Sequence, residues 1–212
     1  MRIALINENS QAAKNAQIEQ GMKKVLEPMG HTIDNYGMKG PDDSSITYVQ
    51  AGLLTALLLN SGAADYVITG CGTGEGAMLA ANAFPGVLCG HIEDPLDAYT
   101  FSQINDGNAI SIPYAKGYGW GGDLNLEYIF EKLFCEEPGQ GYPRDRAVPE
   151  KANKKILDEV KKITHRDFGE ILKDLDPQFV REALSLDSFR DLFFANARDE
   201  KLKKAVKEIL ES

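Results

Sequence analysis

The stretch that decides the fold is ADYVITGCGTGEGAMLAANAFP, residues 64–85. Residues 66–69 are β-branched or aromatic and predict a buried strand. A glycine-rich turn follows over 70–76, and the small residues of 77–83 predict a helix that ends before Pro85. A strand, a glycine-rich turn and a helix N-terminus together form an anion site, because backbone N–H groups and the helix dipole both favour negative charge there.

Strands and helices alternate along the chain as far as residue 135. We expect strands over 3–6, 31–34, 66–69, 87–91 and 109–112, and helices over 11–29, 46–59, 77–83, 95–103 and 123–135. A loop rich in glycine, proline, aspartate and serine is expected over 37–45. This order predicts an α/β fold: a Rossmann-like three-layer αβα sandwich with a five-stranded parallel sheet, whose ligands bind at the carboxyl ends of the strands.

The composition changes after residue 136. Residues 136–149 are rich in glycine and proline and predict a loop or an arm, and a helix is expected over 150–163. Beyond it we expect two or three short amphipathic helices, broken near Pro177 and around 195–196, whose apolar stripes serve packing. The chain thus divides into an α/β domain, residues 1–163, and a C-terminal helical extension, residues 164–212.

The overall composition excludes several classes of function. The chain has 212 residues, 43% of them hydrophobic, and a net charge of −9, which argues against non-specific binding of nucleic acid. Three cysteines without paired spacing predict a reducing compartment rather than a disulfide framework. The chain opens directly on an expected strand and has no apolar run long enough for a bilayer. We therefore expect no signal peptide, no membrane contact and a cytoplasmic location.

Two side chains in the glycine-rich turn can carry chemistry. Cys71 precedes a helix N-terminus, where the pKa of a thiol is expected to fall, and Glu75 places a carboxylate one helical turn later. Backbone N–H groups of residues 72–74, with the Thr73 hydroxyl, can face a developing oxyanion. The spacing matches neither of the two common phosphate-loop motifs. The three histidines lack the spacing of metal ligands, so no metal or other cofactor is expected.

A run of residues in register carries a family resemblance. The run is Gly70-Cys71-Gly72-Thr73-Gly74, Ala80-Ala81-Asn82 and Pro85-Gly86. It resembles the ribose-5-phosphate isomerase B and galactose-6-phosphate isomerase family, over roughly residues 1–163. The resemblance implies an aldose–ketose isomerase that works through a cis-enediolate, with the turn glycines and Tyr48 contacting the sugar. The base is a cysteine at the position of Cys71, or in some members a glutamate at that of Glu75. Both are present here, and Cys71 is preferred.

The remaining family positions match unevenly. Glu8 and Asn9 stand where the family has an Asp-His pair, so the acid is kept and the imidazole is lost. The family then reads His-Asn-x-x-Asn beyond the fourth strand. Here Asn105 and Asn108 remain, while Ile104 replaces the histidine that opens the sugar ring. Because a hydrophobic side chain cannot relay a proton, we expect a preference for substrates presented as open chains, such as four-carbon sugar phosphates.

Phosphate binding in the family uses basic residues that the partner subunit contributes. Arg144 and Arg146, in the expected arm, are the preferred candidates here, which implies a homodimer or a dimer of dimers. Two further side chains have open roles. His91 ends an expected strand beside the site, and Trp120 either covers the site from its glycine-rich loop or packs at a helix start.

The sequence therefore predicts an isomerase of phosphorylated aldoses and ketoses with four to six carbons. The main alternative is a non-catalytic sugar-phosphate-binding or regulatory protein that kept the fold after losing the histidines. A flavodoxin-like nucleotide-binding domain is a second alternative, against which the missing phosphate-loop spacings argue. Catalysis and mere binding differ in whether Cys71 is reactive.

Overall fold

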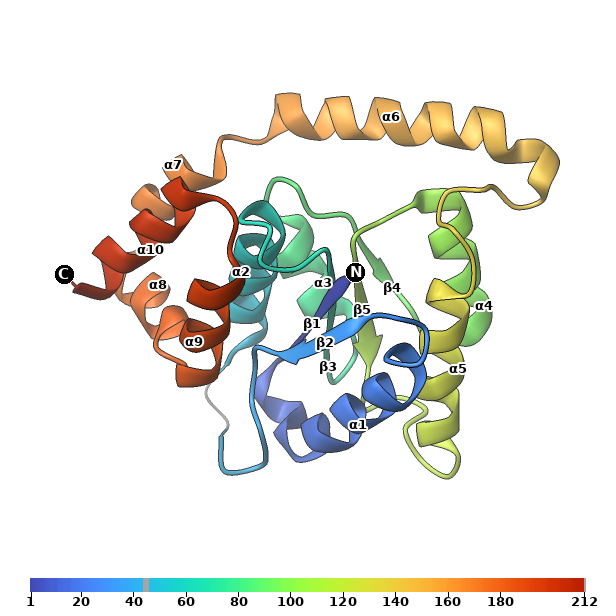
Figure 1. The fold of residues 1–212 in the computed structure, drawn as a ribbon, viewed down its shortest axis with the longest axis horizontal. Coiled ribbons are helices and arrows are strands. Elements are labelled where there is room, and N and C mark those ends of the chain that lie inside the picture. The colour runs from blue at the N-terminus through green and yellow to red at the C-terminus, as the bar shows by residue number, and fades with distance from the viewer. Residues whose placement is uncertain (44–45, 212) are drawn as a thin grey trace.

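A five-stranded parallel sheet forms the centre of the computed structural model, which describes residues 1–43 and 46–211 (Figure 1). Within these residues the strand order is β2-β1-β3-β5-β4, and each neighbouring pair is parallel. The strands are β1 (Arg2–Asn7), β2 (Thr32–Asn35), β3 (Tyr66–Cys71), β4 (Cys89–His91) and β5 (Ala109–Pro113). All six residues of the central strand β3 are buried, as expected for a parallel strand covered on both faces.

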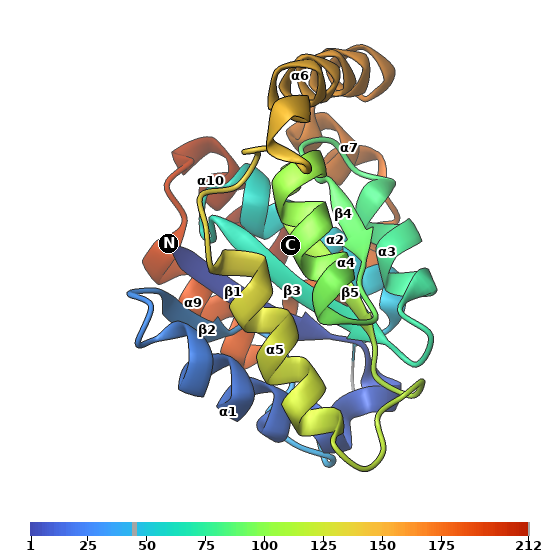
Figure 2. The ribbon, with the colours of Figure 1, turned by 90° about the vertical axis from the view of Figure 1, so that its right-hand side faces the viewer.

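Helices cover both faces of the sheet, so the domain has three layers (Figure 2). On one face, α1 (Asn15–Leu26), α4 (Pro95–Thr100) and α5 (Gly122–Phe134) pack with apolar side chains of β1, β3 and β5. On the other face lie α2 (Tyr48–Asn60) and α3 (Glu75–Asn82). The predicted Rossmann-like αβα sandwich is therefore confirmed.

Two of the expected helices change type along their length. The helix expected over 11–29 begins as a 3-10 turn, Asn9–Lys14, and becomes α1 at Asn15, whose side chain is buried. The helix expected over 95–103 ends in a π turn, Phe101–Asn105. In both places the elements lie where the sequence predicts them, but their hydrogen-bonding pattern is not that of one continuous α-helix.

The extension holds four helices between residues 164 and 211, more than expected. They are α7 (Phe168–Asp174), α8 (Pro177–Leu184), α9 (Asp187–Asn196) and α10 (Glu200–Glu211). Pro177 is the first residue of α8, and Asp176 caps that helix. The additional break falls at 185–186, which contains neither proline nor glycine. Residues 44–45 of the expected loop and Ser212 lie outside the described residues.

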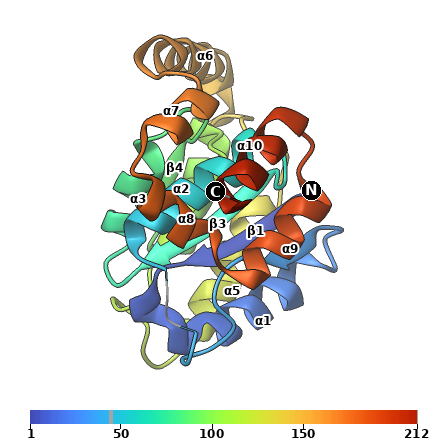
Figure 3. The same cartoon turned by 90° about the vertical axis from the view of Figure 1, so that its left-hand side faces the viewer.

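The extension packs on the outer side of α2 (Figure 3). Nine consecutive residues of α2, 50–58, are buried. Leu184 of α8 and Phe189 of α9 belong to the same apolar cluster as α2 and the sheet. This arrangement explains why α2 is apolar on all sides, because the sheet covers one side and the extension another. The division into domains at residue 163 stays a prediction.

Helix α6 (Ala147–Thr164) stands away from the sheet and links its two sides (Figure 1). None of its side chains, all of which the structure describes, is buried. Val148, Ile156 and Ile163 are 79%, 60% and 83% exposed. Among the described helices, including this one, none combines the length and apolarity needed to cross a membrane.

Helices α2 and α3 make a close approach at Gly52. A Cβ atom on Gly52 would lie 2.6 Å from both the carbonyl carbon and the Cβ of Ala80. Both atoms belong to a helix that is itself packed on the sheet, so neither can move aside cheaply. Glycine at this position is therefore a packing requirement.

We expect Gly52→Ala to lower the free energy of unfolding by about 1–3 kcal/mol, because it overpacks this contact. On an uncrowded helix the same change would raise stability by up to about 1 kcal/mol, so the sign of the effect reports the contact with Ala80. Urea unfolding measures the difference. Gly119→Ala is the control, since nothing lies within 4 Å of its Cβ position. A Gly52→Ala chain as stable as the parent would contradict the close packing.

Candidate active site

The carboxyl ends of β1, β3 and β5 meet at one edge of the sheet. In the observed register Asn7 of β1 lies beside Gly70, and Cys71 lies beside Pro113 of β5. Helix α3 and the segment that follows β1 begin at this edge as well. Open parallel sheets bind their ligands at this edge, which makes it the candidate site.

Cys71 ends β3, and the turn that follows holds its thiol. The residue is 7% exposed. The backbone N–H of Gly74 donates a hydrogen bond to Cys71 Sγ at 3.1 Å, and Thr73 Oγ1 lies 3.9 Å from the same sulfur. The thiol is therefore oriented by the backbone of its own turn.

Glycine at position 74 is required for two reasons. Its φ of 77° lies in the left-handed region, and a Cβ atom there would lie 2.7 Å from His91 Nε2. His91 Nε2 donates to the carbonyl oxygen of Thr73 at 2.9 Å, and Ser111 Oγ donates to that of Gly74 at 2.5 Å. His91 thus fixes the turn through its backbone.

Thr73 and Glu75 are the exposed side chains of the turn. Glu75 is the first residue of α3, and its N–H donates to Thr73 Oγ1 at 3.4 Å. The N–H of Gly74, one of the donors expected for an oxyanion, points at the thiol instead. The oxyanion role of the Thr73 hydroxyl and of the Gly72 and Thr73 backbone stays a prediction.

Glu8 and Asn9 lie beside the turn, as their position after β1 predicts. The N–H of Glu8 donates to the Gly70 carbonyl at 3.2 Å, and that of Asn9 donates to the Ile46 carbonyl at 2.6 Å. Glu8 is 7% exposed, and its carboxylate accepts hydrogen bonds from the Ser10 N–H, at 3.1 Å, and from the Ser10 hydroxyl. The acid therefore shapes the loop after β1.

Ser10 and Gln11 also face the turn, although no motif points to them. A Cβ atom on Gly72 would lie 3.9 Å from Ser10 Oγ and 3.7 Å from Gln11 Nε2. Nearby, Lys14 Nζ donates to the carbonyl oxygen of Tyr114, which directly follows β5. The only sequence feature that could have pointed to Ser10 and Gln11 is that they lie in the segment directly after a strand. Lys14 brings a positive charge to the edge of the site.

Tyr48 reaches the same edge from the start of α2. Thr47 and Gln50 form a capping box that fixes where this helix begins. The ring of Tyr48 covers Gly76 of α3, where a Cβ atom would lie 3.3 Å from Tyr48 Cδ2, and the residue is 49% exposed. The structure thus brings Tyr48, the residues after β1 and the Cys71 turn together.

Other predicted binding residues lie at the opposite edge of the sheet: Asn105, Asn108, Arg144 and Arg146. Asn108 precedes β5; its side chain accepts from the Leu88 N–H at 2.8 Å and donates to the Gly86 carbonyl at 2.7 Å. Arg144 pairs with Glu136. Within one chain Asn108 and Arg144 therefore stabilise their own loops, and none of the four residues meets Cys71.

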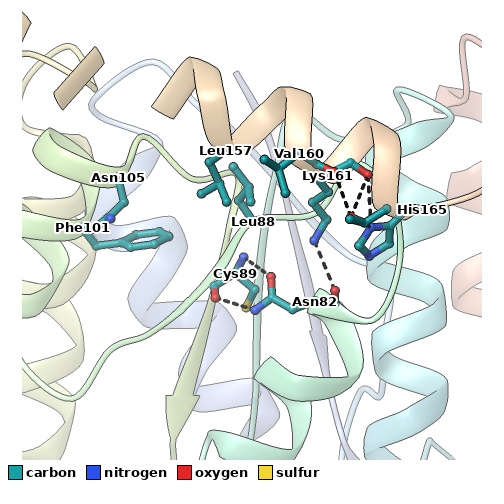
Figure 4. A pocket seen from close by; sticks show the side chains of 10 residues that line it. Asn82, Leu88, Cys89, Phe101, Asn105, Leu157, Val160, Lys161 and His165 are labelled. Atoms are coloured by element: carbon teal, nitrogen blue, oxygen red, sulfur yellow. Dashed lines mark hydrogen bonds between the residues drawn. The ribbon is translucent and has the colours of Figure 1, made fainter. Parts of the chain in front are cut away.

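A cavity of about 380 Å³ lies under α6 at this opposite edge (Figure 4). Its apolar walls are Leu88, Phe101, Leu157 and Val160. Lys161 enters it and donates to the Asn82 carbonyl at 3.2 Å, and burial lowers the pKa of this lysine. Burial also raises the pKa of the Cys89 thiol to about 12. Cys89 is therefore protonated at neutral pH.

Trp120 takes neither of the two roles open to it. It is fully exposed on the loop between β5 and α5. Its ring is therefore not packed at the start of α5 and does not cover the turn. Among the described residues, no group of three or more His, Cys, Asp or Glu side chains is placed to hold a metal ion.

Two family models match the chain. One described as ribose/galactose isomerase matches residues 3–125, and one described as ribose-5-phosphate isomerase matches residues 163–209. The second match falls on the extension, for which the residue pattern predicted only packing. Together the two matches cover both the candidate site and the C-terminal helices.

Two solved structures align with nearly the whole chain. A 4-deoxy-L-threo-5-hexosulose-uronate ketol-isomerase, solved with a tartrate, is 56% identical, covers 100% of both chains and has a TM-score of 0.97. A ribose-5-phosphate isomerase from Vibrio parahaemolyticus is 46% identical, covers 99% of both chains and has a TM-score of 0.96.

Shorter proteins share the α/β domain alone. A ribose-5-phosphate isomerase from Thermotoga maritima is 20% identical, with a TM-score of 0.58, and the match spans 97% of that chain but 74% of this one. This likeness shows the fold. The family model over residues 3–125 and the two full-length matches lead to one conclusion: the chain belongs to the ribose/galactose isomerase family of sugar isomerases.

Proposed function

We propose that this isomerase interconverts an open-chain aldose and its ketose, with Cys71 as the base and an anionic group at the far end of the substrate. The observation that carries the proposal is the Gly74 N–H aimed at Cys71 Sγ at 3.1 Å, at the carboxyl edge of the sheet. A side chain oriented in this way can remove a proton from carbon without a metal ion.

The proposed reaction moves one proton between two carbons. The Cys71 thiolate takes the proton from C2, so that the C2–H bond breaks and its electron pair enters a cis-enediolate. The Thr73 hydroxyl and nearby N–H groups donate to the enediolate oxygens. The Cys71 thiol then returns the proton to C1, while a second proton passes from O2 to O1. The product is the ketose, and the thiolate is regenerated.

Loss of two imidazoles favours a substrate that needs no ring opening. Asn9 and Ile104 stand where the family has histidines. The substrate named for the 56% identical ketol-isomerase has no hydroxyl at C4 and a ketone at C5. It therefore lacks both the C4 hydroxyl that would close a furanose ring on the C1 aldehyde and the C5 hydroxyl that would close a pyranose ring. We therefore propose a hexosulose uronate of this class as the substrate, with a four-carbon sugar phosphate as the alternative.

The anionic end of the substrate needs a positive partner. Asn105, Asn108, Arg144 and Arg146 lie at the opposite edge of the sheet in their own chain. We therefore propose a homodimer, or a dimer of dimers, in which the arm that carries Arg144 and Arg146 completes the neighbour's site. Both arginines are exposed, which is compatible with contacts to another subunit.

Replacing the base should stop the reaction without stopping binding. We expect Cys71→Ala to lower kcat by about a hundredfold to ten-thousandfold, the usual contribution of a positioned base, with little change in the Kd of a substrate analogue. Cys135→Ala is the matched control, because this cysteine is exposed and distant from the turn. Activity that survives in Cys71→Ala and disappears in Glu75→Gln would make the glutamate the base.

Subunit exchange tests the shared site. We expect hybrids of a Cys71→Ala chain with an Arg144→Ala/Arg146→Ala chain to regain activity, because one of their two sites has both intact components. Hybrids made with Arg166→Ala in place of the Cys71 variant control for subunit exchange itself, since Arg166 lies in exposed ion pairs of the extension. Hybrids that form but stay inactive would exclude the shared site.

Substrate choice tests the open-chain proposal. We expect kcat/KM for 4-deoxy-L-threo-5-hexosulose uronate or a four-carbon sugar phosphate to exceed that for ribose 5-phosphate by about a hundredfold, the cost of one missing acid/base group. Comparing the first two substrates decides between carboxylate and phosphate. Ile104→His should raise kcat/KM for ribose 5-phosphate if the pocket admits a ring. A wild-type preference for ribose 5-phosphate would contradict the proposal.

A further inference from the structure

We propose that the C-terminal extension tunes substrate affinity, with Ser188 as the positioning residue. Helix α9 contacts β2, the edge strand of the sheet. The rings of Tyr36 and Phe189 meet edge-on at 5.9 Å, and Asn196 Nδ2 donates to the Tyr36 hydroxyl at 2.9 Å. The extension therefore holds the residue that follows β2.

Ser188 makes the contact nearest to the site. Its hydroxyl donates to the carbonyl oxygen of Gly37 at 2.9 Å. The Gly37 N–H donates to Asn35 Oδ1 at 3.0 Å, and a Cβ atom on Gly37 would lie 3.3 Å from the Cα of Ile6. The chain thus leaves β2 through a narrow crossing over β1, and Ser188 fixes the outer side of this crossing.

Hydrogen bonds continue from the crossing to the loop after β1. The Met38 carbonyl accepts a hydrogen bond from Asn15 Nδ2, and Asn15 Oδ1 accepts one from Asn7 Nδ2 at 2.9 Å. Asn7 is the last residue of β1 and directly precedes Glu8 and Asn9. A shift at Gly37 would therefore displace Glu8 and Asn9, where the chain enters the site.

The same crossing also leads to α2. Before that helix begins, the Ile46 carbonyl accepts the N–H of Asn9 at 2.6 Å, and Ile46 is buried in the apolar cluster that the extension completes. Tyr48, the first residue of α2, covers the start of α3. The inference rests on the proposed function at this point, because it takes Tyr48 as a substrate contact.

The thiol of Cys71 is oriented by other contacts. The thiol, the glycines of its turn and His91 are held by β3, β5 and β4. The shorter Thermotoga maritima protein shares the fold over 97% of its own chain and matches 74% of this one. We therefore expect the extension to act on KM, through Asn9 and Tyr48, and to leave kcat nearly unchanged.

Ser188→Ala tests the inference. We expect KM to rise about three- to tenfold, the factor that one hydrogen bond is worth, with kcat within about twofold of the parent. Ser188→Thr, which keeps the hydroxyl, should restore KM. Amide hydrogen exchange at residues 46–48 should be faster in Ser188→Ala alone. Ser185→Ala is the matched control, because its hydroxyl donates to the Glu182 carbonyl inside the extension, at 2.7 Å.

The outcomes separate this inference from the proposed site. Tyr48→Ala should raise KM at least as much as Ser188→Ala does. If Tyr48→Ala raises KM and Ser188→Ala does not, the inference is overturned and the proposed site stands. Equal effects of Ser185→Ala and Ser188→Ala would also overturn it, since they would report general loosening of the extension. An unchanged KM in Tyr48→Ala would overturn the proposed sugar contact, and the inference with it.

Discussion

Complete burial of β3 is the constraint on which the rest of the structure depends. A parallel strand buried along its whole length needs a strand on each side and helices on each face. Strands β1 and β5 meet the first need, and the two helical layers meet the second. Because the three central strands run in one direction, they end together, and the segments that leave them converge around Cys71.

The fold of the α/β domain could be predicted because apolar runs and glycines mark the same boundaries there. The start of α1 could not be predicted, because Asn15 is held there by buried hydrogen bonds to Asn7 and to Met38, which lies in another loop. The break between α8 and α9 at 185–186 could not be predicted either. It contains neither proline nor glycine, so packing of α8 and α9 against the rest of the core sets it.

One part of the candidate site follows from topology and the other part does not. Residues directly after β1 and β3 must share an edge, so the meeting of Glu8 and Cys71 was predictable. Asn108 and Arg144 were predicted from a family pattern. Such a pattern does not say whether a residue belongs to the site of its own subunit or to that of a neighbouring subunit. Asn108 precedes β5, a strand of five residues, so about 16 Å of strand separates it from the edge where Cys71 lies. The Gly74 N–H aimed at the thiol depends on a left-handed φ, which no motif specifies.

The exposed helix α6 has a consequence for how this chain can change during evolution. It carries the chain from the arm beside α4 and α5 to the extension beside α2, a path of about 27 Å for 18 helical residues (Figure 1). Deleting a single residue would shorten this path by about 1.5 Å and rotate everything after it by about 100°. Point substitutions in α6 are free to accumulate on its solvent side. Insertions and deletions cannot accumulate in the same way, because the docking of α7 to α10 on α2 fixes both the length of α6 and the direction in which the chain leaves it.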